Sequence, residues 1–149
     1  MFWLIRFTLD WLVWLVLADK SRWREILPVC IFASWLSYIV EAIVVHYKLW
    51  SYTGHQLLAL NLNGTGCYIV VTYLFIQWLP TNRSFKKMFL YWFYWTGFSI
   101  LFEWFHICWG QMQYYQWWNW KLSYASDWFL FWVFYKYYKV SHLRKLSEK

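Results

Sequence analysis

The stretch FEWFHICW, residues 102–109, places a carboxylate and an imidazole three positions apart among aromatic and aliphatic side chains. On a helix, positions i and i+3 share a face, so Glu103 and His106 are expected to point the same way. Such a pair can bind a ligand, a proton or a metal ion. It can equally be a structural pair whose two members satisfy each other.

Other ionisable side chains interrupt apolar segments in the same way, namely Arg6, Asp10, Glu41, His46 and Asp127. A charge at the centre of a bilayer costs at least about 2.5–3.5 kcal/mol, so it normally faces the bundle interior or a wet cavity. We therefore expect these five residues, together with Glu103 and His106, to form a ligand-binding cluster. Because its four acids face one arginine, the cluster favours a cation or a proton.

The same residues bear on metal and haem chemistry. Carboxylates and imidazoles on neighbouring helices resemble part of a metal site in a helix bundle. Only one Glu-x-x-His motif is present, and Glu41 and His46 are spaced differently, so a di-iron set is incomplete. No nucleophile or phosphate-binding motif occurs. We expect no cofactor and a non-enzymatic role, with a metal- or haem-dependent membrane enzyme using Glu41, Glu103 and His106 as the alternative.

The composition is typical of a membrane protein. Of 149 residues, 62% are hydrophobic and 14% charged, whereas soluble domains carry about 25% charged residues. At about 20 residues per spanning helix, the chain can hold five spans and no separate soluble domain. The sequence therefore predicts one all-α integral membrane domain, 1–149, with spans at 2–18, 26–47, 58–79, 88–109 and 123–140.

The basic residues alternate between the two sides of this predicted bundle. One side holds only Arg6, Lys48 and Lys121, and the other holds the remaining eleven, including Arg144, Lys145 and Lys149. The positive-inside rule then places the N-terminus outside and the C-terminus in the cytoplasm. The net charge of +7 is therefore a topology signal and an attraction to anionic lipid, and no nucleic-acid partner is expected.

Two alternatives concern the first and last spans. The tripeptide VLA before Asp19 could end a signal peptide, but Asp10 interrupts the apolar run, so we expect an uncleaved span. Residues 123–140 are short and end close to YKYYK, so this segment could lie in the membrane interface instead of crossing.

The predicted topology also places the ionisable side chains at similar depth. The first, third and fifth spans run inward and the others outward, which puts these residues near the outer end of each span that carries them. At about 1.5 Å per residue, they fall in the outer third of the bilayer. We expect an outward-opening polar cluster in which Glu103 and His106 face Glu41, walled by segments 49–52 and 114–124. A purely structural cluster, with Arg6 and Asp10 as an i,i+4 pair, is the alternative.

Glycines and prolines mark the ends of the spans. Pro28 is expected to open the second span and Pro80 to close the third, where a missing N–H costs least. Gly64 and Gly66 are expected to let helices approach closely near the start of the third span.

Several short motifs resemble an uncharacterised family of small multipass membrane proteins from endospore-forming Gram-positive bacteria. They are WREILP (23–28), Glu41, LWSY (49–52), Pro80 before a basic loop, Glu103, and a Tyr/Trp-rich loop ending at Ser123. The resemblance covers residues 20–130. It implies a plasma-membrane or spore-membrane protein and supplies no activity.

Together these features predict a multipass protein of the cell membrane that binds a small ligand, cation or proton in its outward-facing cluster. Its partners would be the lipid bilayer and further copies or other membrane proteins, in a channel, transporter or spore-membrane assembly. The remaining alternative is a purely structural partner in a membrane complex. That alternative predicts that the carboxylates tolerate amide substitution.

Overall fold

The structure is a computed structural model that describes residues 1–141, and in that range the chain forms five long helices. They are α1 (Phe2–Leu17), α2 (Trp23–Tyr47), a helix made of α3 (Gln56–Leu62), the π-helical turn Asn63–Cys67 and α4 (Tyr68–Gln77), then α5 (Phe85–Cys108) and α6 (Trp120–Val140). The all-α prediction is confirmed. The five predicted segments coincide with these helices, whereas Arg144, Lys145 and Lys149 of the predicted topology lie outside the described residues.

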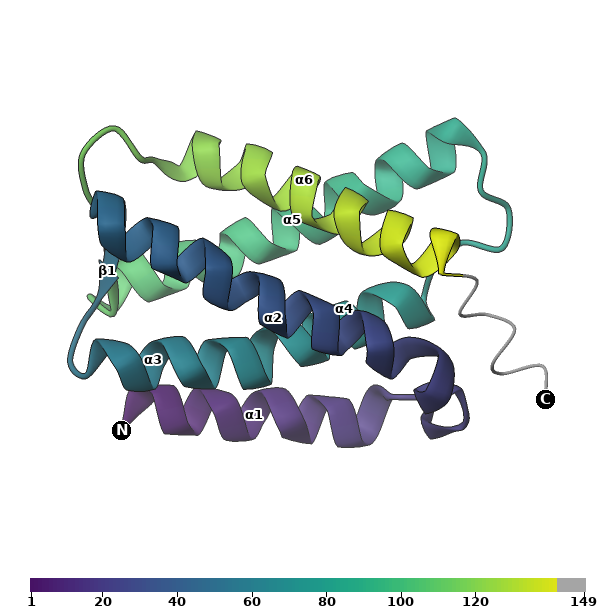
Figure 1. Cartoon of the computed structure of the whole chain (residues 1–149), viewed down its shortest axis with the longest axis horizontal. Helices are drawn as coiled ribbons and strands as arrows, with labels where there is room; N and C mark the ends of the chain where they lie inside the picture. The colour runs from purple at the N-terminus through teal and green to yellow at the C-terminus, as the bar shows by residue number, and fades with distance from the viewer. Residues whose placement is uncertain (142–149) are drawn as a thin grey trace.

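Consecutive helices run antiparallel, so both chain loops that are rich in Trp and Tyr meet at one end of the bundle (Figure 1). There β1 (Trp50–Tyr52) pairs antiparallel with β2 (Met112–Tyr114). We call this the ladder end, and the opposite end, where Lys and Arg gather in the loops, the basic end. The central helix α2 packs on α4 and α6, while α1 packs on α3, the π turn and α4, and α5 packs on α6.

Two glycines of the π turn lie against neighbouring helices. A Cβ at Gly64 would approach Ser37 Oγ of α2 to 2.9 Å, and one at Gly66 would approach the Phe7 ring of α1 to 2.7 Å. Both distances are too short for a side chain, so only glycine lets the π turn contact α2 on one side and α1 on the other. The prediction of close helix approach at these two glycines is confirmed.

Helix α2 begins earlier than predicted because a capped turn precedes it. The Asp19 carboxylate accepts hydrogen bonds from the backbone N–H of Ser21 (3.0 Å) and from its hydroxyl (2.6 Å), which initiates the 3-10 turn Lys20–Arg22. These bonds also hold the pKa of Asp19 below its usual value. Pro28 therefore lies inside α2 and not at its start, which corrects the prediction for this proline.

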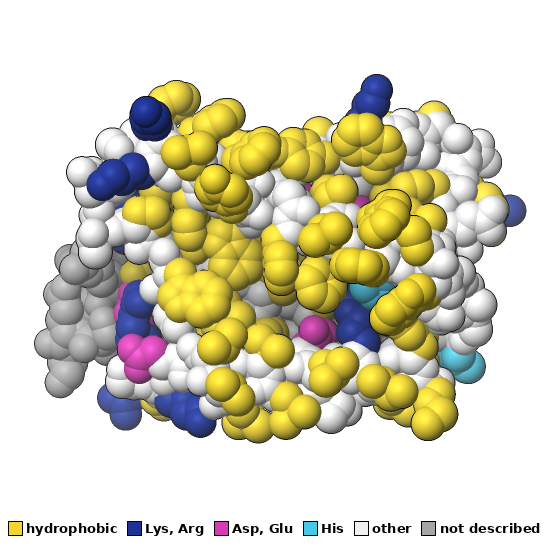
Figure 2. Space-filling model, turned by 180° about the vertical axis from the view of Figure 1, so that it is seen from behind, with side chains coloured by type: hydrophobic (Ala, Val, Ile, Leu, Met, Phe, Trp, Pro, Cys, Tyr) yellow, Lys and Arg dark blue, Asp and Glu magenta, His cyan; other side chains and the backbone are white. Residues whose placement is uncertain are grey.

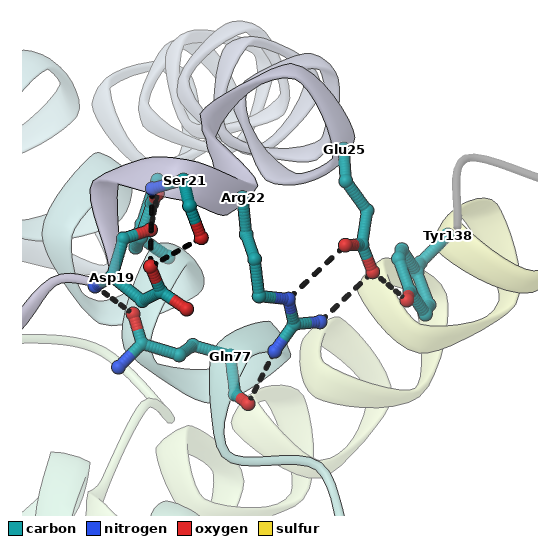
Figure 3. A network of polar contacts seen from close by, with 7 residues as sticks. Asp19, Ser21, Arg22, Glu25, Gln77 and Tyr138 are labelled. Carbon is teal, nitrogen blue, oxygen red and sulfur yellow. Dashed lines mark hydrogen bonds and ion pairs between the residues drawn. The ribbon is translucent and has the colours of Figure 1, made fainter. Parts of the chain in front are cut away.

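A partly buried polar network ties the helices together at the basic end (Figure 3). Arg22 pairs with Glu25 through Nε–Oε2 (3.1 Å) and Nη2–Oε1 (2.8 Å), and its Nη1 donates to the Gln77 carbonyl at 2.9 Å. The hydroxyl of Tyr138 in α6 donates to Glu25 Oε1. The Gln77 side chain accepts from the Asp19 N–H at 2.7 Å. The network thus links the α1–α2 loop, α2, α4 and α6.

Next to this network lies the hydrophobic core. It is formed by Ile26, Val29, Cys30, Ala33, Tyr73, Phe75, Ile76, Phe131, Phe134 and Tyr138, from α2, α4 and α6. The Phe75 and Phe131 ring centroids are 4.6 Å apart, and the Tyr91 hydroxyl of α5 donates to the Phe75 carbonyl at 2.6 Å. The core therefore fills the bundle in its half nearer the basic end.

Large hydrophobic side chains also cover the outside of the bundle. Along α5 the exposed residues are almost all aromatic or aliphatic, and Figure 2 shows hydrophobic side chains spread across a whole face. Monomeric soluble proteins rarely expose continuous apolar patches beyond a few hundred Å². Two helices, Lys20–Tyr47 and Gln56–Gln77, are long and apolar enough to cross a membrane, a test that some core helices of soluble proteins also pass. The exposed apolar surface is the stronger support for membrane association.

Candidate functional site

All seven predicted site residues lie toward the ladder end, and six of them are on buried or half-buried sides of their helices. The antiparallel order of the helices brings them together from α1, α2, α5 and α6. Asn63 of the π turn joins them. We call the following residues the polar cluster: Arg6, Asp10, Glu41, Asn63, Glu103, His106 and Asp127.

Glu41 is buried at 5% exposure and shares a small network with β1 and the π turn. Its Oε1 accepts a hydrogen bond from the Tyr52 hydroxyl at 3.2 Å, and Asn63 Nδ2 donates to the same hydroxyl at 3.4 Å. Glu41 Oε2 and Asn63 Oδ1 are buried and have no hydrogen-bond partner among the described residues. Asn63 lies within reach of Glu41, but no well-aligned hydrogen bond from residues 1–141 reaches either of these two oxygen acceptors.

Tyr52 lies among the charges of the cluster. Burial raises the pKa of its phenol well above the usual 10.0, and the nearby charges of Glu41 and Glu103 add to this effect while Arg6 opposes it. At neutral pH Tyr52 is therefore a protonated hydrogen-bond donor. Both Glu41 and Glu103 are therefore close enough to Tyr52 for their charges to act on its phenol.

Arg6 forms the predicted pair with Asp10 in α1, but the contact is long. Arg6 Nε lies 3.9 Å from Asp10 Oδ2, beyond hydrogen-bond range, and finds no other hydrogen-bond partner in the described chain. The guanidinium lies over the Trp3 ring, 5.8 Å from its centroid, and beside the thiol of Cys67 in the π turn. Arg6 thus keeps an unused donor inside the bundle.

His106 does not form a couple with Glu103. Its Nδ1 lies 2.5 Å from the Phe102 carbonyl, which can only accept, so Nδ1 donates. The ring stacks on Trp3, with centroids 5.4 Å apart, and Phe2 packs edge-on against it. Nε2 is buried without a partner within residues 1–141, and in a neutral imidazole it is an acceptor.

Glu103 instead faces α6. Its Oε1 accepts from the Ser123 hydroxyl at 2.9 Å, and Ser123 in turn accepts from Trp118 Nε1 at 2.9 Å. Tyr114 of β2 is also within hydrogen-bonding reach of Glu103. Asp127 lies one turn beyond Ser123 and close enough to Glu103 for their charges to interact. The structure therefore places two carboxylates near each other at the contact of α5 and α6.

The structure does not bring His46 into the cluster. Its side chain is exposed and its ring packs edge-on against the neighbouring Tyr47 at 4.7 Å. Positions 41 and 46 differ by about 140° around a helix, so a buried Glu41 directs His46 to the outside. The prediction that His46 joins the ligand-binding cluster is corrected accordingly.

Two hydroxyl groups of this region were not predicted as carboxylate partners. Tyr52 follows Glu41 by 11 residues and Ser123 follows Glu103 by 20. They lie in the aromatic segments 49–52 and 114–124, which were expected only to surround the cluster. One signal for these two hydroxyls was present in the sequence, because a Leu, Ser and Tyr motif occurs in both segments. It reads LWSY at 49–52 and LSY at 122–124. Tyr52 reaches Glu41 from β1, whereas Ser123 reaches Glu103 because α6 packs on α5.

The chemistry of the cluster follows from this geometry. Within the described residues no three His, Cys, Asp or Glu side chains converge to hold a metal ion. What the cluster offers is a set of buried acceptors, four carboxylates and one guanidinium.

Comparison with models of protein families, with curated proteins and with solved structures finds no match to this chain. The fold and cluster therefore define the class, an all-α bundle with an apolar exterior and a polar interior at one end.

Proposed function

We propose that the protein is a five-span membrane protein, with the ladder end outside, whose polar cluster binds a small cationic ligand that donates hydrogen bonds. The apolar exterior of the helices supports immersion in a bilayer. The basic end carries Lys20, Arg22, Arg24, Arg83, Lys86 and Lys87, in the α1–α2 and α4–α5 connections and in the first turns of α2 and α5. The positive-inside rule assigns such an end to the cytoplasm.

One observation carries the binding proposal. Glu41 Oε2, Asn63 Oδ1 and His106 Nε2 are buried acceptors that lack a donor in the described part of the chain. Leaving a buried polar group unsatisfied costs about 1–3 kcal/mol. A ligand with N–H or O–H groups would recover part of this cost, and four carboxylates against one guanidinium favour a positive charge on it.

The position of the hydrophobic core supports binding over conduction. The core side chains of α2, α4 and α6 lie between the polar cluster and the Arg22–Glu25 network. A hydrated path from one end of the bundle to the other would have to pass through this packed aromatic layer. The proposal is therefore a one-sided binding site, as part of a larger membrane assembly or of a homo-oligomer, and the resemblance noted above favours a cell or spore membrane.

A thermal-unfolding titration of the purified protein in a nonionic detergent tests the proposal. Ethylammonium chloride, sodium chloride and sodium acetate serve as probes at equal ionic strength. We expect ethylammonium to raise the unfolding temperature, since a ligand at 100 times its Kd stabilises by about 2.7 kcal/mol. Acetate should give no shift beyond that of its sodium ion.

Glu41→Gln is the matched variant, because the amide keeps an acceptor for Tyr52 while removing the charge. It should lose most of the ethylammonium shift. Trp104→Phe is the control, since Trp104 is 55% exposed on α5 and should keep the full shift. A wild-type protein that responds to no cation, or a Glu41→Gln variant that responds equally, would identify the cluster as purely structural.

A further inference from the structure

The polar cluster is closed at the ladder end by aromatic rings. Trp3 is only 6% exposed and stacks on His106, and Tyr52 packs edge-on against Trp3 with centroids 4.9 Å apart. The loops beyond are fastened by the Thr53 N–H, which donates to the Gln111 carbonyl at 3.0 Å. A ligand coming straight from that end would have to displace this packed layer.

The hydrophobic core blocks access to the polar cluster from the basic end. The remaining route for a ligand is through the side of the bundle, between α1 and α5. These helices touch at the ladder end, where Phe2 packs on His106 and Trp109. Farther along, α1 packs on α3, the π turn and α4, whereas α5 packs on α6. The two helices therefore flank the cluster without sealing it from the side.

Side-chain exposure agrees with such a lateral opening. The Arg6 and Asp10 side chains are 17% and 22% exposed, and Glu103 and Asp127 are half-buried, although all four lie in otherwise apolar helices. Figure 2 shows Lys/Arg, Asp/Glu and His side chains grouped in a recess of the hydrophobic face. In a bilayer, this recess would face lipid.

We propose that the recess between α1 and α5 receives the headgroup of a phospholipid that carries a primary ammonium group, entering sideways from the bilayer. This inference rests on the proposed function and names its ligand class. The acyl chains would lie on the exposed apolar side chains of α1 and α5, such as Leu9 and Phe102.

Charge complementarity selects this headgroup. The ammonium group would lie among the four carboxylates of the polar cluster, within reach of Glu41, and the phosphate would lie near Arg6, whose Nε has no hydrogen-bond partner among the described residues. An anionic headgroup without an amine could pair with Arg6, but the four carboxylates would repel it and no ammonium group would offset them. A quaternary ammonium carries no N–H to donate to the buried acceptors, whereas a primary ammonium has three.

Native mass spectrometry of the detergent-purified protein tests the inference directly. The protein is mixed with phosphatidylethanolamine, phosphatidylcholine and phosphatidylglycerol that share the same acyl chains. We expect a preference for phosphatidylethanolamine of roughly tenfold, the equivalent of about 1.4 kcal/mol. Equal adducts of the three lipids would overturn the inference, because they indicate a nonspecific lipid shell.

Three variants locate the headgroup. The double variant Glu103→Gln with Asp127→Asn should reduce phosphatidylethanolamine binding to the phosphatidylcholine level. Arg6→Gln should weaken lipid binding but keep the thermal response to ethylammonium, which has no phosphate. Asp19→Asn, an exposed acid at the basic end, should leave the preference unchanged. Circular dichroism verifies that each variant is folded, and the wild-type preference stands as evidence independently of the variants.

The outcomes separate this inference from the proposed function. If ethylammonium stabilises the protein through Glu41 and no lipid is preferred, the cluster binds a water-soluble cation and the lateral route is wrong. If neither ethylammonium nor phosphatidylethanolamine has an effect, both proposals fail. A preference for phosphatidylglycerol would overturn this inference, because that lipid carries no ammonium group for the carboxylates to bind.

Discussion

The hydroxyl of Tyr52 uses all of its hydrogen-bonding capacity. It donates to Glu41 at 3.2 Å and accepts from Trp50 Nε1 at 3.3 Å and from Asn63 Nδ2 at 3.4 Å. A phenol has one proton to donate, so Glu41 receives the only hydrogen bond that this side chain can give. The position of the carboxylate therefore depends on a residue of the loop and not on its own helix.

Replacing Tyr52 by Phe should lower the free energy of unfolding by about 1–3 kcal/mol, because Glu41 Oε1 then loses its donor in a buried site. Thermal unfolding followed by circular dichroism in detergent measures the loss. Tyr115→Phe is the control, since Tyr115 is exposed and, within residues 1–141, its hydroxyl hydrogen-bonds to Ser51 of β1 and Gln113 of β2 at the surface. Equal stability of the Tyr52 and Tyr115 variants would show that the buried network contributes nothing.

The side-chain directions explain which part of the site the sequence could predict. Helix periodicity correctly placed Glu103 and His106 on one broad face, and the topology placed the charged residues toward one end. Positions i and i+3 still differ by about 60° around the helix. That difference lets Glu103 reach Ser123 in α6 while His106 stacks on Trp3 in α1. Which neighbour each side chain meets depends on the packing of helices, which no local pattern encodes.

At the level of elements, the π turn is where three helices meet most closely. Gly66→Ala should separate the turn from α1, because the new Cβ would lie 2.7 Å from the Phe7 ring. Overpacking of this kind typically costs about 1–3 kcal/mol, which a shift in unfolding temperature would report.

Gly97→Ala is the matched control for this prediction. Gly97 lies in α5, and a Cβ there would meet nothing within 4 Å among the described residues. Alanine in place of an exposed helical glycine should stabilise by about 0.5–1 kcal/mol. If both alanine variants changed stability in the same direction, close packing at Gly66 would not be the reason that the turn needs glycine.

The helices could be predicted from the sequence, but the ladder could not. Apolar runs of about 20 residues located all five helices, because such runs identify long apolar helices whatever their neighbours are. The strands Trp50–Tyr52 and Met112–Tyr114 have only three residues each, too few for an alternating pattern to stand out. The early start of α2 depends on the Asp19 cap, which lies outside the apolar run.

At the level of the whole molecule, the proposed orientation predicts where each loop lies. Reporter domains fused after Thr53 or after Asn119 should be outside the cell, and one fused after Asn82 should be in the cytoplasm. The alternation of basic residues between the two ends is the physical reason. Alkaline phosphatase, active only outside the cytoplasm, and a fluorescent protein that folds inside it are suitable reporters.

A cytoplasmic reporter after Thr53 would contradict both the orientation and the outer location of the cluster. Agreement after Thr53 with disagreement after Asn119 would instead show that fewer than four helices cross before α6.

The pairing of β1 with β2 determines the order in which the molecule can be completed. Trp50 and Tyr114 are partners across 64 positions of the chain, whereas helices form from contacts within a few residues. Closing so long a loop costs conformational entropy before any hydrogen bond is gained. We therefore expect the ladder to form after the helices, and the hydrogen bond from Tyr52 of β1 to Glu41 to form with it.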